Sequence, residues 1–186
     1  MDHNLQNGIS RRVLVVGGGL ALLIRTFATA PQAADAPTID ERFEFLSKNG
    51  NSTCSTAFLK SIPTMPVTAR IQGSCCSPME RKRYGEQVQG LTKYQDIPEI
   101  PPDPYDIAAG LAQKLLAYND TALTIDEQRA YDYAMEHSDE KGPCCCQCWR
   151  WRVFGGLGKY LIRERRFTGE QVTEIWNLAD GCGGDG

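Results

Sequence analysis

Pro143-Cys144-Cys145-Cys146-Gln147-Cys148-Trp149 places four of the chain's eight cysteines within five positions and leads directly into a strong apolar pattern. The pattern predicts a helix from about Gln147 to Glu164. Its apolar positions recur at helical spacing, at Trp149, Val153, Phe154, Leu157, Leu161 and Ile162. One short stretch does not need this much sulfur for packing, so we expect cysteine chemistry at the start of a core helix.

Cysteines at a helix start favour the thiolate form. Backbone amides and the positive helix end lower a cysteine's pKa below its free value of about 8.5. Cys75 and Cys76 precede a second predicted helix start near Pro78. In an extended backbone Cys144, Cys146 and Cys148 would point one way, whereas in a helix Cys148 would share a face with Cys144 and with Cys145. Either geometry presents two or three sulfurs to one ion, and Cys182 or the Cys75-Cys76 pair would complete a site of about four ligands.

The residue types favour a soft metal. His137 is the only histidine beyond the first 36 residues, so the expected ligands are thiolates. Thiolates select Cu(I), zinc or iron–sulfur clusters. The spacing matches neither ferredoxin pattern, which places an iron–sulfur cluster behind copper and zinc. We therefore predict a protein that binds copper or zinc, and we claim no catalytic activity for it. The predicted metal ligands are Cys144, Cys145, Cys146 and Cys148, with Cys182, Cys75 and Cys76.

Two alternatives remain open at this stage. Eight half-cystines in an exported chain allow 105 disulfide pairings and would make a disulfide-stabilised structural or interaction domain. Adjacent cysteines cannot bridge one another without strain, so distant partners would have to converge on one tripeptide. The second alternative is a thiol–disulfide oxidoreductase that uses Cys145 and Cys148 as a C-x-x-C pair at a helix start.

The first 36 residues have the form of an export signal. Ser10-Arg11-Arg12 precedes an apolar run from Val13 to Ile24, and small residues follow from Ala28 to Ala36. The run is twelve residues long, against roughly 20 for a membrane span. We predict a twin-arginine type signal peptide over residues 1–36, with the twin-arginine export machinery as a partner. The domain over residues 37–186 is then periplasmic or extracellular, and the alternative is a retained N-terminal membrane anchor with the domain outside.

The composition limits the classes of partner and of scaffold that fit this chain. The formal net charge is −3, and loss of the arginines of the leader would make the chain more acidic. An acidic chain without a basic stripe argues against nucleic acid as a partner. Eight cysteines in a domain of about 150 residues are about 5%, below the roughly 8 to 10% of scaffolds that need disulfides to fold.

The remaining patterns predict a mainly α single domain of about five or six short helices with a proline-rich connector. Capping signals start helices at Thr38 with Glu41, at Ser77-Pro78-Met79-Glu80, and at Thr124 with Glu127. Four prolines make residues 96–104 an extended strap across the domain. The predicted helices cover about 39–48, 78–94, 106–118, 125–137, 147–164 and a last segment after Thr168. A short helical turn at 57–62 and one weak strand at 67–72 are also predicted.

The cysteine-rich segment resembles an exported bacterial family named for its Pro-Cys-Tyr-Cys-Gly-Cys motif. The resemblance runs from Pro143 through Gly155-Gly156-Leu157 to Cys182, and Cys144, Cys146 and Cys148 take the three motif cysteines. Cys145 replaces the tyrosine and Gln147 the glycine of the motif. The family usually has Gly-His after the motif, where this chain has Gly155-Gly156, so no histidine ligand carries over. The resemblance implies metal binding and twin-arginine export of a folded protein whose metal is inserted before translocation.

Overall fold

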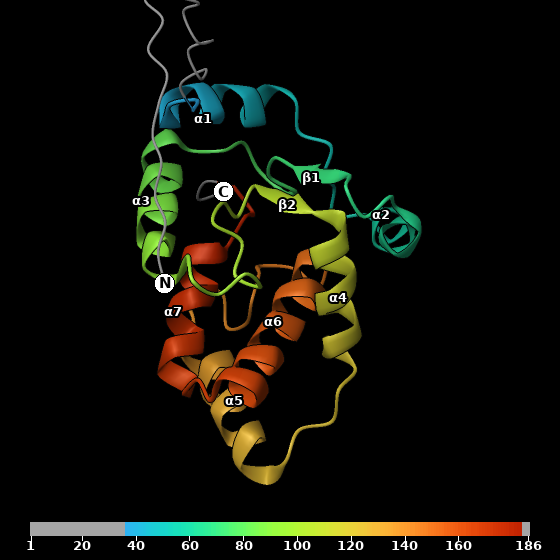
Figure 1. Cartoon of the computed structure of the whole chain (residues 1–186), viewed down its shortest axis with the longest axis vertical. Helices are drawn as coiled ribbons and strands as arrows, with labels where there is room; N and C mark the ends of the chain where they lie inside the picture. Colours follow the sequence, from blue (N-terminus) through green and yellow to red (C-terminus); the bar gives the residue numbers. More distant parts are fainter. Residues whose placement is uncertain (1–35, 184–186) are drawn as a thin grey trace, which may run out of the picture. The chain divides into compact units, whose positions relative to one another are not determined.

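The computed structural model describes residues 36–183, which belong to one compact unit. The predicted export signal, apart from Ala36, lies outside the described residues. Within residues 36–183 the chain forms seven α-helices, two short 3-10 helices and one two-stranded sheet, which confirms the mainly α prediction (Figure 1). The helices are α1 Ile39–Lys48, α2 Thr56–Ser61, α3 Arg81–Leu91, α4 Ala109–Asn119, α5 Ile125–His137, α6 Trp149–Arg165 and α7 Gly169–Ala179. The 3-10 helices are η1 Ile62–Thr64 and η2 Thr92–Tyr94, and the strands are β1 Arg70–Gln72 and β2 Asp106–Ala108.

Helix α6 forms the centre of the core. It packs against α4, α5 and α7, which surround it in Figure 1, and against α2. Its apolar stripe is fully buried, as the sequence predicts, and Trp149 and Phe154 are each exposed by 1% or less. Burying such side chains stabilises the fold by roughly 1.5–3 kcal/mol each. Removal of α6 would therefore remove the core that positions the cysteines at its start.

Glycine lets α4 approach α6 closely. A Cβ on Gly156 would lie 1.9 Å from the carbonyl oxygen of Leu115 and 3.0 Å from the backbone nitrogen of Asn119. No side chain fits there without moving the backbone of α4. Gly156 therefore serves the packing of α6 against α4.

Local capping signals set most helix starts. Thr38 with Glu41 and Thr124 with Glu127 form reciprocal capping boxes, as predicted, and Thr168 forms a third with Gln171. The predicted start of α3 at Pro78 is wrong, because Glu80 caps this helix and accepts hydrogen bonds from the backbone N–H groups of Lys82 and Arg83. Cys76 consequently lies several residues before the helix.

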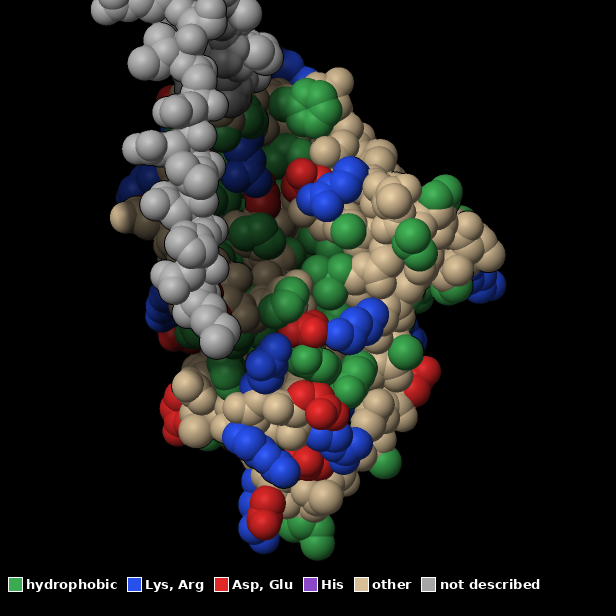
Figure 2. Space-filling model, in the orientation of Figure 1, with side chains coloured by type: hydrophobic (Ala, Val, Ile, Leu, Met, Phe, Trp, Pro, Cys, Tyr) green, Lys and Arg blue, Asp and Glu red, His purple; other side chains and the backbone are tan. Residues whose placement is uncertain are grey.

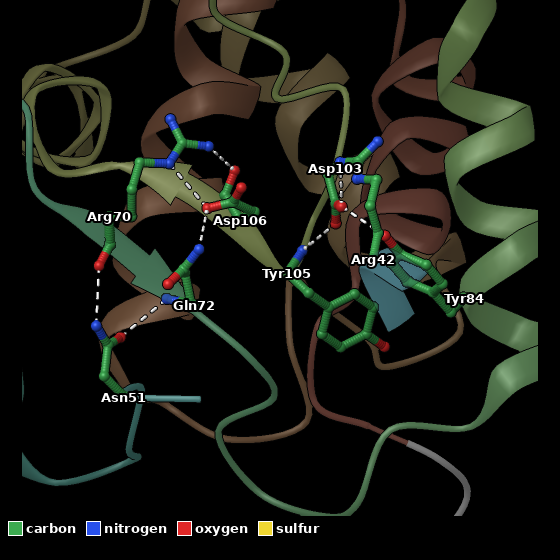
Figure 3. A network of polar contacts seen from close by, with 8 residues as sticks. All are labelled: Arg42, Asn51, Arg70, Gln72, Tyr84, Asp103, Tyr105 and Asp106. Carbon is green, nitrogen blue, oxygen red and sulfur yellow. Dashed lines mark hydrogen bonds and ion pairs between the residues drawn. The ribbon is translucent and has the colours of Figure 1, made fainter. Parts of the chain in front are cut away.

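The sheet is antiparallel, with Ile71 opposite Ile107 at its centre. The predicted strand at 67–72 shortens to β1, and β2 replaces the first turn of the helix predicted from Asp106. Asp106 accepts hydrogen bonds from the side chains of Arg70 and Gln72, and Asn51 bonds the backbone of β1 at Arg70 and Gln72 (Figure 3). The chain segment after α1 is thereby fixed beside β1.

The strap over residues 96–104 is not extended as predicted; it is a series of turns and bends. Its anchor is Asp103, a buried carboxylate that pairs with Arg42 of α1 and accepts hydrogen bonds from the Tyr84 hydroxyl and the Tyr105 N–H (Figure 3). Burial raises the pKa of Tyr84 above its ordinary value, with its bond to Asp103 acting in the same direction. The strap thus joins α1 and α3 to the rest of the domain.

The visible surface carries acidic and basic side chains side by side, mainly in the lower half of Figure 2. Ion pairs of the domain include Arg163 with Glu127 and Lys114 with the buried Glu99. No helix within residues 36–183 combines the length and apolar character that a membrane crossing requires.

Candidate metal centre

All eight cysteines converge on one cluster, which we call the sulfur cluster. They come from four separate segments: Cys54 before α2, Cys75 and Cys76 after β1, Cys144 to Cys148 before α6, and Cys182 after α7. None of the eight forms a disulfide. Sulfur atoms up to 128 positions apart in the sequence thus lie within one small volume, because Cys54 and Cys182 both belong to it.

The sulfur atoms are in direct contact with one another. The shortest Sγ–Sγ distances are 2.7 Å, for Cys54 with Cys76 and for Cys144 with Cys182. Cys145 lies 3.0 Å from Cys182. The remaining contacts are 3.6 Å for Cys76–Cys146 and Cys54–Cys146, 3.7 Å for Cys75–Cys76, and 3.8 Å for Cys144–Cys148 and Cys76–Cys145.

The cluster contains overlapping groups of three sulfurs that lie within 4.8 Å of one another. Such spacing suits a single soft ion, since a metal–sulfur bond is about 2.3 Å long. The five groups are Cys54-Cys146-Cys148, Cys54-Cys75-Cys76, Cys75-Cys144-Cys182, Cys76-Cys145-Cys182 and Cys144-Cys145-Cys146.

The segment before α6 is neither extended nor helical; it consists of bends. It begins after a turn in which the Ser138 hydroxyl donates to the Gly142 carbonyl and accepts from the Gly142 N–H. Its last residue, Cys148, is the N-cap of α6 and donates its N–H to the Cys146 carbonyl at 2.8 Å. The predicted placement of cysteine at a helix start is therefore confirmed for Cys148.

Hydrogen bonds also fix the other three cysteine-bearing segments. Ser77 donates its N–H and its hydroxyl to the Cys182 carbonyl, at 2.9 and 3.0 Å, which joins the segment of Cys75 and Cys76 to the tail. On the other side, Asn51 and Ser52 donate their N–H groups to the Gln72 carbonyl at the end of β1. These bonds bring Cys54 to Cys76.

Burial changes in steps across the cluster. Cys144, Cys148 and Cys182 are buried, Cys54, Cys75 and Cys146 are partly buried, and Cys76 and Cys145 are exposed. The cluster therefore has a protected interior and one side that faces solvent.

The cysteines divide into thiols and thiolates. Burial raises the pKa of Cys54 and of Cys146 to about 11. By contrast, the hydrogen bond from Cys144 lowers the pKa of Cys148 to about 2, with help from Cys75 and from the backbone N–H groups of Arg150 and Trp151. Contact with Cys144 also lowers the pKa of Cys182. The buried end therefore favours the thiolate, the form that binds a metal, at Cys148 and Cys182, whereas contacts with these two residues raise the pKa of Cys144.

A buried guanidinium lies beside the cluster. Arg150 is 1% exposed and donates to the carbonyls of Pro104 at 2.6 Å and Gly73 at 3.0 Å. Its guanidinium carbon lies 4.7 Å from the centre of the Trp149 ring, and a Cβ on Gly181 would lie 2.2 Å from it. Contact with Cys144 lowers the pKa of Cys75, but contacts with Cys148 and Cys182 together with burial outweigh it, and the charge of Arg150 adds a smaller lowering.

The structure brings together all seven cysteines that the sequence suggested as ligands, and it adds Cys54. Nothing in the local sequence around Cys54 marks it, because its approach to Cys76 depends on contacts far apart in the chain. Cys145 and Cys148 share none of the three-sulfur groups, and Cys145 lies 3.0 Å from Cys182. Met79 packs with Leu46 and Tyr84 in a smaller second core. His137 stacks on Tyr133 with ring centres 3.9 Å apart.

Comparison of the chain with family models, with curated proteins and with solved structures gave no match. The case for a functional site therefore rests on the geometry and chemistry of the sulfur cluster.

Proposed function

We propose that this protein binds a soft metal ion, copper or zinc first, through the thiolates of the sulfur cluster. The observation that carries the proposal is the convergence of eight free cysteines from four segments into groups of three sulfurs in mutual reach of one ion. Thiolate ligands favour Cu(I) and zinc over magnesium or calcium, which prefer oxygen.

An iron–sulfur cluster suits this arrangement less well. In such clusters inorganic sulfide bridges the irons, and the cysteine thiolates attach from outside. Cysteine sulfurs are then spread around the cluster, whereas here Cys144 lies 2.7 Å from Cys182 and 3.8 Å from Cys148. The 3.8 Å between Cys144 and Cys148 fits two sulfurs bound directly to one ion with bonds of about 2.3 Å.

The cellular setting of the proposal comes from the sequence. The twin-arginine pattern at Arg11-Arg12 predicts export through the twin-arginine machinery to the periplasm or the cell exterior. That route carries folded proteins, so the metal would enter the cluster before export. The resemblance to the Pro-Cys-Tyr-Cys-Gly-Cys family points in the same direction.

A disulfide-stabilised domain is the second candidate, and one observation favours it. Cys54 with Cys76 and Cys144 with Cys182 lie 2.7 Å apart, which is close to the bonding distance of about 2.05 Å. Oxidation would join these two pairs first. The protein would then be a structural or interaction domain outside the cytoplasm.

Metal content and thiol content together distinguish the two candidates. The protein is purified from the compartment to which its leader directs it, and metal is measured by elemental analysis. Thiols are then counted under denaturing conditions after metal removal without oxygen. We expect bound copper or zinc and eight free thiols. Absence of both metal and free thiols would contradict metal binding and establish the disulfide domain.

Variants supply the control for this measurement. Cys144→Ser combined with Cys148→Ser removes sulfurs from three of the five groups and should strongly reduce the bound metal. His137→Ala removes a metal-binding residue type that lies outside every group, so its metal content should match that of the unmodified protein.

A further inference from the structure

We infer that the sulfur cluster holds several Cu(I) ions together, as one polynuclear copper–thiolate cluster in which most of the cysteines bridge two ions. This inference rests on the proposed function and adds to it the metal, its oxidation state and the number of ions.

Single cysteines link the three-sulfur groups to one another. Every cysteine except Cys148 belongs to two groups, and no two groups share more than one sulfur. A thiolate has more than one lone pair and binds two soft ions at once. Groups that meet at single sulfurs therefore correspond to neighbouring metal ions joined by bridging thiolates.

The number of sulfurs in each group suits Cu(I) better than zinc. Structural zinc takes four ligands in a tetrahedron. The groups found among the described residues each contain three sulfurs, and none contains four. Monovalent copper is a closed-shell soft ion that accepts two or three thiolates, so it matches the groups as they stand. One ion per group sets an upper limit of five ions per chain.

The buried positive charge of Arg150 requires a negative charge nearby. Within residues 36–183 no carboxylate pairs with this guanidinium, although it is 1% exposed. Its Nε is buried without a hydrogen-bond partner. A buried charge is costly unless an opposite charge lies nearby. Eight thiolates with five monovalent ions leave a net charge of −3, which provides that opposite charge beside Cys75 and Gly181.

The exposed cysteines give metal ions access to the cluster from solvent. The group of Cys76, Cys145 and Cys182 contains both exposed cysteines and one buried cysteine. An arriving ion would bind there first and move inward by exchange between shared sulfurs. Each thiol that binds releases its proton to the buffer while copper stays monovalent, so loading consumes no oxidant and no reductant.

The test is a titration of the reduced, metal-free chain with Cu(I) in the absence of oxygen, against a chelator of known Cu(I) affinity. Native mass spectrometry then counts the ions, and X-ray absorption detects copper neighbours around copper. We expect three to five Cu(I) ions per chain, loaded together, with a copper–copper signal. One ion per chain, or several without that signal, would overturn the polynuclear cluster and leave soft-metal binding intact. Absence of Cu(I) and zinc binding would overturn both.

Two neighbouring variants sharpen the count. Cys146→Ser removes a member of two groups, whereas Cys148→Ser removes a member of one. Cys146→Ser should therefore lose more ions than Cys148→Ser, and equal losses would contradict the bridging arrangement. Because Cys148 caps α6, the fold of each variant is checked by circular dichroism. Cys145→Ser, at an exposed member of two groups, repeats the two-group measurement at a site where folding is least at risk.

Discussion

The Sγ atom of Cys54 lies 2.7 Å from that of Cys76, although 22 positions separate the two residues. The contact joins the segment after α1 to the segment after β1 at the exposed side of the cluster. Cys54 belongs to two three-sulfur groups, one with Cys75 and Cys76 and one with Cys146 and Cys148. The cysteine that the sequence marked least is therefore as well connected as Cys144.

Replacement of Cys54 tests whether it is a copper ligand of the sulfur cluster. Cys54→Ser should lower the number of Cu(I) ions by up to two, because it breaks two of the five groups. Thr53→Ala changes an exposed neighbour whose hydroxyl contacts only Ser55 in the described structure, and it should leave the count unchanged. Equal copper content in Cys54→Ser and the unmodified chain, measured by mass spectrometry, would exclude Cys54 as a ligand.

Arg150 should affect copper affinity through its charge. Arg150→Met removes the buried cation that faces the thiolates, so the affinity for Cu(I) should fall on the order of tenfold, or about 1.4 kcal/mol. Competition with a Cu(I) chelator measures this affinity. Arg152→Met, at an exposed position of the same helix, is the matched control and should bind as the unmodified chain does. A similar loss in both variants would attribute the effect to net charge alone.

The exposed cysteines should control the rate of loading. Cys145→Ser alters the group that faces solvent, so copper uptake from a chelator complex should slow severalfold in stopped-flow measurements. Cys148→Ser changes a buried cysteine outside that group and should reduce the final copper content while keeping the initial rate. Unchanged initial rates in Cys145→Ser would show that ions enter elsewhere.

Sequence patterns predicted the helices whose signals are local. The capping boxes at Thr38 and Thr124 act within one turn, and both helices start where those signals place them. The pattern Ser77-Pro78-Met79-Glu80 failed because the N–H and hydroxyl of Ser77 both bond the Cys182 carbonyl, which lies 105 positions away. A tertiary contact thus displaced a local capping signal.

The same limit applies to the sheet and to the sulfur cluster. β2 is three residues long, and its partner β1 lies more than 30 positions earlier, so periodicity alone did not distinguish it from the first turn of α4. Cysteine density identified the loop at Cys144 to Cys148. The approach of Cys54 depended on the hydrogen bonds between residues 51–52 and β1, which no local pattern encodes.

Gly156 should be required for stability. A methyl group there would meet the Leu115 carbonyl at 1.9 Å, so Gly156→Ala should destabilise the metal-free protein by about 1–3 kcal/mol in urea unfolding. In Gly85→Ala the new methyl would approach only the flexible Arg81 guanidinium, and helix propensity should add up to about 1 kcal/mol of stability. Equal effects of the two substitutions would contradict the close packing of α4 on α6.

Glu127 should make the stability of the domain depend on pH in acid. Its bond with the Arg163 guanidinium, joined by the Thr124 N–H, lowers its pKa from 4.5 to about 2 in the folded protein. A depressed folded pKa means that the folded state favours the ionised form, so the stabilisation is complete above about pH 4.5 and is lost as the pH falls toward 2. Glu127→Gln should therefore melt at a lower temperature than the unmodified chain at pH 7, and the difference should shrink steadily below pH 4.5. Glu136→Gln, at an exposed position near the other end of α5, should show no such convergence. A difference for Glu127→Gln that stays constant from pH 7 to pH 2 would mean that its charge does not hold α5 to α6.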